Sequence, residues 1–135
     1  MISIHDNNVY AIDIQCKEKA IILHTEFREG KLTEYVDVVF SGVTAHHFYH
    51  VLDGNILFDI TESPPQNFYE ENKKYLQEFS RYGLPINCDS SKIFEEQIKK
   101  ENLRIFEINP TYGLSGWVIA ENLEYLDGRE EPEKA

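Results

Sequence analysis

The sequence has few basic residues, and this shortage limits the partners that it can bind. Its 135 residues include 13 Lys and Arg against 24 Asp and Glu, which gives a formal net charge of −11. Residues 1–67 carry 10 acids and 4 bases, and residues 68–135 carry 14 and 9, so the excess is spread along the chain. Such a surface repels nucleic acid and anionic membranes and attracts basic partners. We therefore expect a basic protein partner, no nucleic acid and no membrane.

Long apolar runs and paired cysteines are also missing. No stretch approaches the roughly 18 apolar residues that a membrane-spanning helix needs. The N-terminal MISIHDNNVY lacks the basic region and apolar stretch of a signal peptide. Cys16 and Cys88 form no CxxC pair, and without a secretion signal we expect two buried thiols in a reducing cytoplasm.

Motifs that carry catalysis or bind cofactors are absent as well. The chain contains no GxGxxG and no GxxxxGK[ST] phosphate loop, and GLSGW at 113–117 lacks the spacing of a GxSxG nucleophile elbow. Cys88 precedes a predicted helix start, where the helix field could lower its pKa, whereas Cys16 falls on an apolar strand face. We expect no cofactor, no metal and no enzymatic activity.

Alternating apolar residues in the first sixty positions predict about six strands. The clearest segments are VYAIDIQC (9–16), KAIILHTEF (19–27), LTEYVDVVF (32–40) and NILFDI (55–60), the last of which is apolar enough to be buried on both faces. Turn signals at Asn7-Asn8, Glu29-Gly30 and Asp53-Gly54 predict hairpins, and Ser41-Gly42 predicts a bulge or bend. We interpret these strands as a meander.

Helical spacing replaces this alternation after Pro64-Pro65. A first helix is predicted to about Tyr82, with a stripe of Phe68, Tyr75, Leu76, Phe79 and Tyr82, and a shorter second helix begins after a cap at Asp89, Ser90 or Ser91. Strands at 103–108 and 116–126 follow. Strands separated from helices indicate an α+β fold with a mostly antiparallel sheet and the helices on one face. We expect one domain over residues 1–126 and a frayed acidic tail over 127–135.

Three histidines cluster in VTAHHFYHV (43–51). In a helix, His46 and His50 would lie one turn apart, as in a zinc pair, but the β-branched and aromatic neighbours favour a strand. In a strand their Cα atoms would lie about 13 Å apart, too far to bind one metal ion together. We therefore interpret the cluster as strand histidines.

A resemblance accompanies this segment. DVVFSGVTAHHFYHVLDGNILFDITE (37–62) resembles a pattern in short uncharacterised bacterial proteins, and the small acidic α+β format resembles the immunity proteins of bacterial toxin systems. The resemblance implies a bacterial protein that neutralises a toxin, and it carries no catalytic residue with it.

The leading hypothesis is thus a non-enzymatic acidic domain that binds a basic protein, with a toxin as the concrete partner. We expect the contact on the sheet face that the helices leave uncovered, through Asp13, His24, Glu26, Asp37, His46 and His50. A small metal-dependent hydrolase near His46, His50 and Asp59 and a homo-oligomeric structural protein remain as alternatives.

Overall fold

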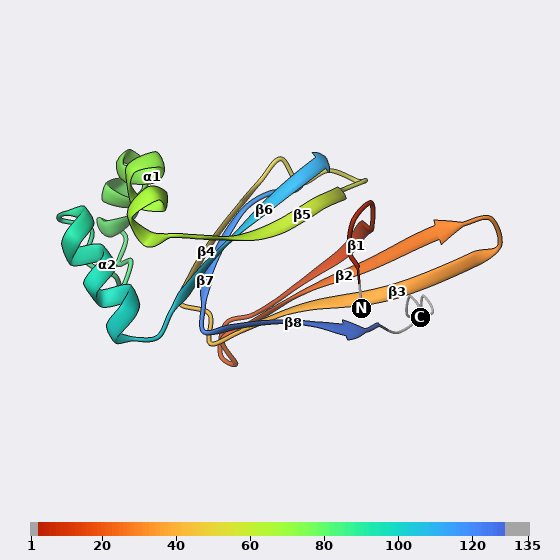
Figure 1. Ribbon diagram of the computed structural model, residues 1–135, viewed down its shortest axis with the longest axis horizontal. Coiled ribbons are helices and arrows are strands. Elements are labelled where there is room, and N and C mark those ends of the chain that lie inside the picture. Colours follow the sequence, from red (N-terminus) through yellow and green to blue (C-terminus); the bar gives the residue numbers. More distant parts are fainter. Residues whose placement is uncertain (1–2, 129–135) are drawn as a thin grey trace.

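One antiparallel sheet of eight strands and two helices make up residues 3–128, the part of the chain that this computed structural model describes (Figure 1). The elements, in chain order, are β1 (Asn8–Gln15), β2 (Ala20–Glu29), β3 (Leu32–Ser41), β4 (Ala45–Tyr49), β5 (Ile56–Ser63), α1 (Pro65–Ser80), α2 (Ser91–Lys100), β6 (Arg104–Tyr112), β7 (Ser115–Ala120) and β8 (Asn122–Asp127). The sheet order is β4-β7-β6-β5-β1-β2-β3-β8. The predicted α+β class, with helices packed against an antiparallel sheet, is confirmed.

The sheet folds back on itself at one shared bend. β3 turns into β4 at Gly42, whose φ is +63°, and β7 turns into β8 at Glu121. The Glu121 N–H donates to the carbonyl oxygens of Ser41 and Gly42 at 3.0 and 3.2 Å, so the β3–β8 pairing continues across the bend into the β4–β7 pairing. Two halves result, β1-β2-β3-β8 and β5-β6-β7-β4, which diverge from this bend in Figure 1.

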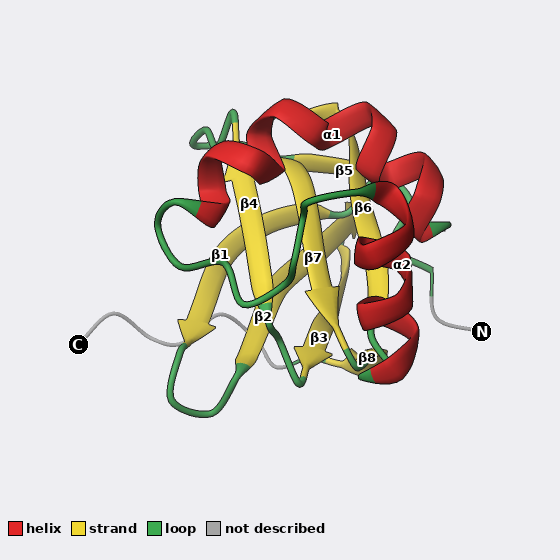
Figure 2. Ribbon diagram, turned by 90° about the vertical axis from the view of Figure 1, so that its left-hand side faces the viewer, coloured by secondary structure: helices red, strands yellow, loops and turns green. Residues whose placement is uncertain are grey.

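Two hydrophobic cores lie on opposite sides of the second half. The inner core fills the space between the halves. It includes four fully buried side chains, Leu23, Val38, Leu57 and Val118. The helix core lies between the two helices and the β4-β7-β6 face, and Phe68, Phe94 and Trp117 are at its centre. Figure 2 shows both helices over this face. Within residues 3–128, the outer face of β1-β2-β3-β8 therefore has no helix over it.

Local sequence explains how the helices begin and end. Pro65 occupies the first turn of α1, where its missing N–H costs nothing, and Gly83 beyond its end has a φ of +95°. The Ser90 hydroxyl accepts the Ile93 N–H at 3.2 Å and caps α2. Phe68 and Leu76 are buried as their spacing predicts, but Tyr82 lies beyond α1 and is 87% exposed, so it is not part of the stripe.

The strand connections differ from the predicted meander. Five strands precede the helices and three follow them, and consecutive strands form hairpins in two places within residues 3–128, at β1-β2-β3 and at β6-β7. Asp53-Gly54 closes no hairpin, because β4 pairs with β7 while β5 pairs with β6 and β1. The side-chain oxygen of Asn55 accepts hydrogen bonds from the N–H groups of Leu52 and Leu114. These bonds hold the segment between β4 and β5 as a loop.

Burial also differs from the predictions at several positions. NILFDI is not buried on both faces: Leu57 is buried, but Phe58 is 51% exposed. An extra residue, Tyr10, bulges between the pairs Val9–Thr25 and Ala11–His24 and shifts the alternation of β1. Cys16 lies exposed in the β1–β2 turn, so it fills no core.

The sheet continues past Leu126 into the first residues of the expected tail. Asp127 pairs with Val36, and the Gly128 N–H donates to the Tyr35 carbonyl at 2.9 Å. The rest of the expected tail, 129–135, lies outside the described residues, as do residues 1–2. Within the described residues, neither helix has the length and apolar character to cross a membrane.

Candidate functional site

The outer face of β1-β2-β3-β8, which we call the open face, gathers most of the sequence-predicted site residues. Residues directly opposite in an antiparallel pair point to the same side. His24 lies opposite Asp37 and Ala11, Glu26 lies opposite Tyr35, and Asp13 lies opposite Ile22. Their neighbours in sequence, Leu23, Thr25 and Val38, are fully buried, so the site residues face outward.

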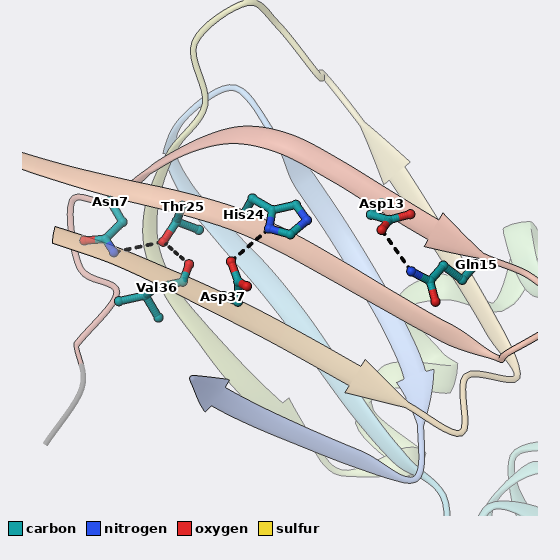
Figure 3. A network of polar contacts seen from close by, with 7 residues as sticks. All are labelled: Asn7, Asp13, Gln15, His24, Thr25, Val36 and Asp37. Carbon is teal, nitrogen blue, oxygen red and sulfur yellow. Dashed lines mark hydrogen bonds and ion pairs between the residues drawn. The ribbon is translucent and has the colours of Figure 1, made fainter. Parts of the chain in front are cut away.

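A histidine–aspartate pair lies in the middle of the open face. His24 Nδ1 is 2.9 Å from Asp37 Oδ1, and both side chains are about one quarter exposed, at 27% and 23% (Figure 3). The Tyr10 ring lies 6.2 Å from the His24 ring and meets the Tyr35 ring edge-on at 6.2 Å. The bulge at Tyr10 thus brings a tyrosine beside His24, and Tyr35 packs against this tyrosine.

Carboxylates surround this pair. The Asp13 carboxylate accepts the Gln15 amide at 2.9 Å, as Figure 3 shows, and Glu26 accepts Arg28 at 3.3 Å. Glu124 of β8 lies opposite Val39 and adds a carboxylate on the strand next to β3. Four carboxylates thus share the face with one arginine, and aromatic and aliphatic side chains lie between them.

Two further polar residues support the face from the inside. Asn7 and Thr25 are 3% and 0% exposed. The Asn7 amide donates to the Thr25 hydroxyl at 3.0 Å, which donates to the Val36 carbonyl at 2.7 Å (Figure 3). This chain of bonds joins the N-terminal segment to β2 and β3 and fixes the backbone beneath the site.

His46 and His50 lie away from the open face. His46 is on β4 opposite Val118, a residue of the inner core, and its ring lies 5.0 Å from that of Phe48. Burial lowers the pKa of His46, and the neighbouring His47 lowers it further. His50 follows the end of β4, is exposed and has a φ of +60°. The structure therefore brings four of the six predicted site residues together and separates two.

Two of the three clustered histidines, His46 and His47, lie on a strand, as their neighbours predict. His47 points to the helix side, where its ring lies 2.9 Å from the Tyr75 hydroxyl through Nδ1, and burial lowers its pKa. Over residues 3–128, no three His, Cys, Asp or Glu side chains come together as a metal site would need. Cys88 is buried, as expected, and burial raises its pKa, which is opposite to the lowering that a helix start could produce.

Sequence reasoning missed three members of the open face: Tyr10, Tyr35 and Glu124. The bulge turns Tyr10 outward, and no local signal reveals a bulge whose cause is the pairing with β2. Glu124 joins the face because β8 pairs with β3, more than 80 positions earlier in the chain. Tyr35 could have been found, since it alternates with Asp37 on a clear strand pattern.

Two comparisons with known proteins give no match. No protein-family model matches the sequence, and no solved structure matches this chain. A function must therefore be argued from the geometry and charge of the site.

Proposed function

We propose that this protein is a non-enzymatic, cytoplasmic binding domain that docks a basic protein partner on its open face and, in its concrete form, neutralises a bacterial toxin. The single observation behind the proposal is that Asp13, Glu26, Asp37 and Glu124 share a helix-free sheet face with Tyr10, Tyr35 and Leu126. Tyrosines and a 47% exposed Leu126 supply apolar contact area, and the carboxylates supply charge.

Charge complementarity determines the kind of partner. Opposite charges across an interface accelerate encounter and reject wrong partners, while affinity comes from well-packed aromatic and apolar anchors. The face also lies on a rigid support, because the bonded Asn7, Thr25 and Val36 fix the strands beneath it. A rigid face loses little conformational entropy when a partner binds.

A defined basic probe tests the docking surface. We expect a short peptide of alternating arginine and glycine to shift the amide resonances of β1, β2, β3 and β8 in an NMR titration. The shifts should weaken strongly when the salt is raised from about 0.02 to about 0.3 M, because exposed charges are screened at that ionic strength.

Two double variants that remove the same charge from different surfaces provide a test and its control. The double variant Glu26→Gln/Asp37→Asn should bind the peptide more weakly, whereas Glu70→Gln/Glu71→Gln, which removes the same charge from the exposed side of α1, should bind as the parent does. Equal loss in both variants would mean that net charge alone attracts the peptide, and the open face would lose its role.

The toxin-neutralising role has a cellular test. The protein encoded by the neighbouring gene would be expressed in a host with and without this chain, and growth would be followed. We expect growth to stop without the chain, to recover with it, and to fail again with Glu26→Gln/Asp37→Asn. Recovery that is unchanged by this variant would contradict docking on the open face.

A further inference from the structure

The sheet has two edge strands, and they differ in charge. Within residues 3–128 the strand order ends at β8 on one side and at β4 on the other, so one side of each strand has no partner strand (Figure 2). Glu124 and Asp127 place two carboxylates on β8, and charged side chains are one means by which proteins keep an edge strand from pairing with another molecule. β4, with the sequence AHHFY, carries no Asp, Glu, Lys or Arg. The edge at β4 therefore lacks this protection.

The strand beside β4 is uncharged as well. Residues 38–52 and 108–120 are the two longest runs of the sequence without Asp, Glu, Lys or Arg, although 27% of the chain is charged. The sheet brings the two runs together, because β4 from the first run pairs with β7 from the second. On the helix side, the neutral Tyr75 hydroxyl contacts the His47 ring. The acidic excess of the protein is thus absent from both strands at this edge.

Apolar side chains are exposed at the end of the same edge. Tyr49 is the last residue of β4, and Val51 and Leu52 follow it in the loop to β5; all three are exposed. The exposed Tyr112 ring lies at this loop, since a Cβ atom on Gly54 would be 3.9 Å from it. This edge therefore combines unpaired backbone groups with apolar area that a neighbouring molecule can cover.

We infer that β4 pairs in antiparallel orientation with β4 of a second copy of this chain, so that two sheets join along this edge. Charge favours a copy as the occupant. Two molecules that each carry a net charge of −11 repel one another over most of their surfaces, and this repulsion is weakest where acidic residues are absent. A basic partner gains no such advantage at an uncharged edge. The inference does not depend on the proposed function, because the open face belongs to the other half of the sheet.

The sequence of β4 is complementary to itself in this orientation. A two-fold axis at His47 places Ala45 of one copy opposite Tyr49 of the other on the helix side, so a small side chain faces a large one. On the inner-core side it places His46 opposite Phe48, a pair of rings that already pack at 5.0 Å within one chain. No like charges oppose one another along this pairing, as they would in a pair of β8 strands. The contact is the same on both copies, so the assembly closes at two.

The oligomeric state of the full chain tests the inference. We expect sedimentation equilibrium at neutral pH to show a species with twice the chain mass of 15.8 kDa. This species should dissociate on dilution from about 500 to about 5 μM, because an interface built on one short strand belongs to the small and weak class. A monomer throughout this range would overturn the inference and would leave the edge to a strand of some other protein.

A lysine on the edge provides the variant, and a lysine elsewhere its control. Tyr49→Lys puts a charge at the exposed end of β4 and should raise the dissociation constant of the dimer at least about tenfold, since a charged edge resists pairing. Leu32→Lys adds the same charge at an exposed position at the start of β3 and should leave the dissociation constant unchanged. Circular dichroism checks that both variants fold. Equal effects of the two variants, or no effect of Tyr49→Lys, would contradict pairing through β4.

An intermolecular contact identifies the edge without any substitution. Ala45 and Tyr49 are four residues apart on one strand, so their Cα atoms lie about 13 Å apart within a chain. In a mixture of ¹³C-labelled and unlabelled protein, we expect an isotope-filtered nuclear Overhauser effect between the Ala45 methyl group of one copy and the Tyr49 ring of the other. Dimers whose intermolecular contacts lie at β8, on the open face or on the helices would overturn the inference.

Discussion

At the scale of single residues, Gly116 shows how closely two strands of the sheet approach. Its φ is +144°, and a Cβ atom there would lie 1.9 Å from the His47 carbonyl oxygen, which is backbone and cannot move aside. We predict that Gly116→Ala lowers the free energy of unfolding by roughly 2–5 kcal/mol, from overpacking and backbone strain together. Urea denaturation followed by circular dichroism measures the loss.

Gly30 is the matched control for this substitution. It also has a positive φ, of +62°, but a Cβ atom there meets nothing within 4 Å. Gly30→Ala should therefore cost only about 1–2 kcal/mol, the strain of the left-handed conformation alone. Equal losses in the two variants would show that the contact with His47 is unimportant.

His46 and His47 make stability depend on pH. Burial holds the pKa of both below the ordinary value of 6.5, so the unfolded chain binds these protons more readily than the folded protein. Their stabilising contribution is complete above pH 6.5 and is lost as the pH falls below it. We predict that the urea midpoint falls between about pH 7.5 and about pH 5.5.

Exposed histidines provide the control for this pH dependence. His46→Gln/His47→Gln should flatten the dependence, whereas His5→Gln/His50→Gln should preserve it, because His5 and His50 are exposed in the folded protein. If the urea midpoint of His46→Gln/His47→Gln still falls steeply with pH, other groups cause the pH dependence of stability.

At the scale of elements, α2 depends on the cap at Ser90, the residue just before the helix begins. The Ser90 hydroxyl satisfies an N–H group that the helix itself leaves unbonded. We predict that Ser90→Ala lowers the free energy of unfolding by about 1 kcal/mol, while Ser91→Ala, one position inside the helix, changes it by less than about 0.5 kcal/mol. Thermal denaturation of the two variants measures the difference.

The sequence predicts local elements well and long-range pairings poorly. Gly30 and Ser90 mark a turn and a cap through their own chemistry, so β2, β3 and α2 could be located from the chain alone. The partner of β4 could not, because β7 lies about seventy positions away and no local residue identifies it. Asp53-Gly54 misleads for the same reason: its hairpin signal is weaker than the pairings that β4 and β5 make elsewhere.

The candidate site follows the same rule. Alternation places His24 on the back of its own strand, but it does not show which way the neighbouring strand faces; the β2–β3 pairing brings His24 to 2.9 Å from Asp37. His46 and His50 were assigned to that face on the assumption that β4 continues the meander. The bend at Gly42 instead carries β4 to the other half of the sheet, where His46 faces the inner core.

At the scale of the whole molecule, a net charge of −11 acts against folding. Like charges are closer together in the folded protein than in the unfolded chain, so they repel one another more strongly there. We predict that added NaCl raises the thermal midpoint steadily up to about 0.5 M, where the screening length is only a few ångströms. A fall in the midpoint would show that attractive ion pairs such as Arg104–Glu62 outweigh the repulsion.

The shared bend has a consequence for the order in which the molecule is made. β3 and β4 are synthesised early, yet the strands that pair with them, β8 and β7, are among the last residues of the sheet to leave the ribosome. The β1–β2–β3 hairpins can form on the emerging chain, but β4 has no partner in the described sheet until β7 has been made. A nascent chain of this protein therefore exposes the strand with His46 and Phe48 while about seventy further residues are added, and a chaperone that binds extended apolar segments would find it there.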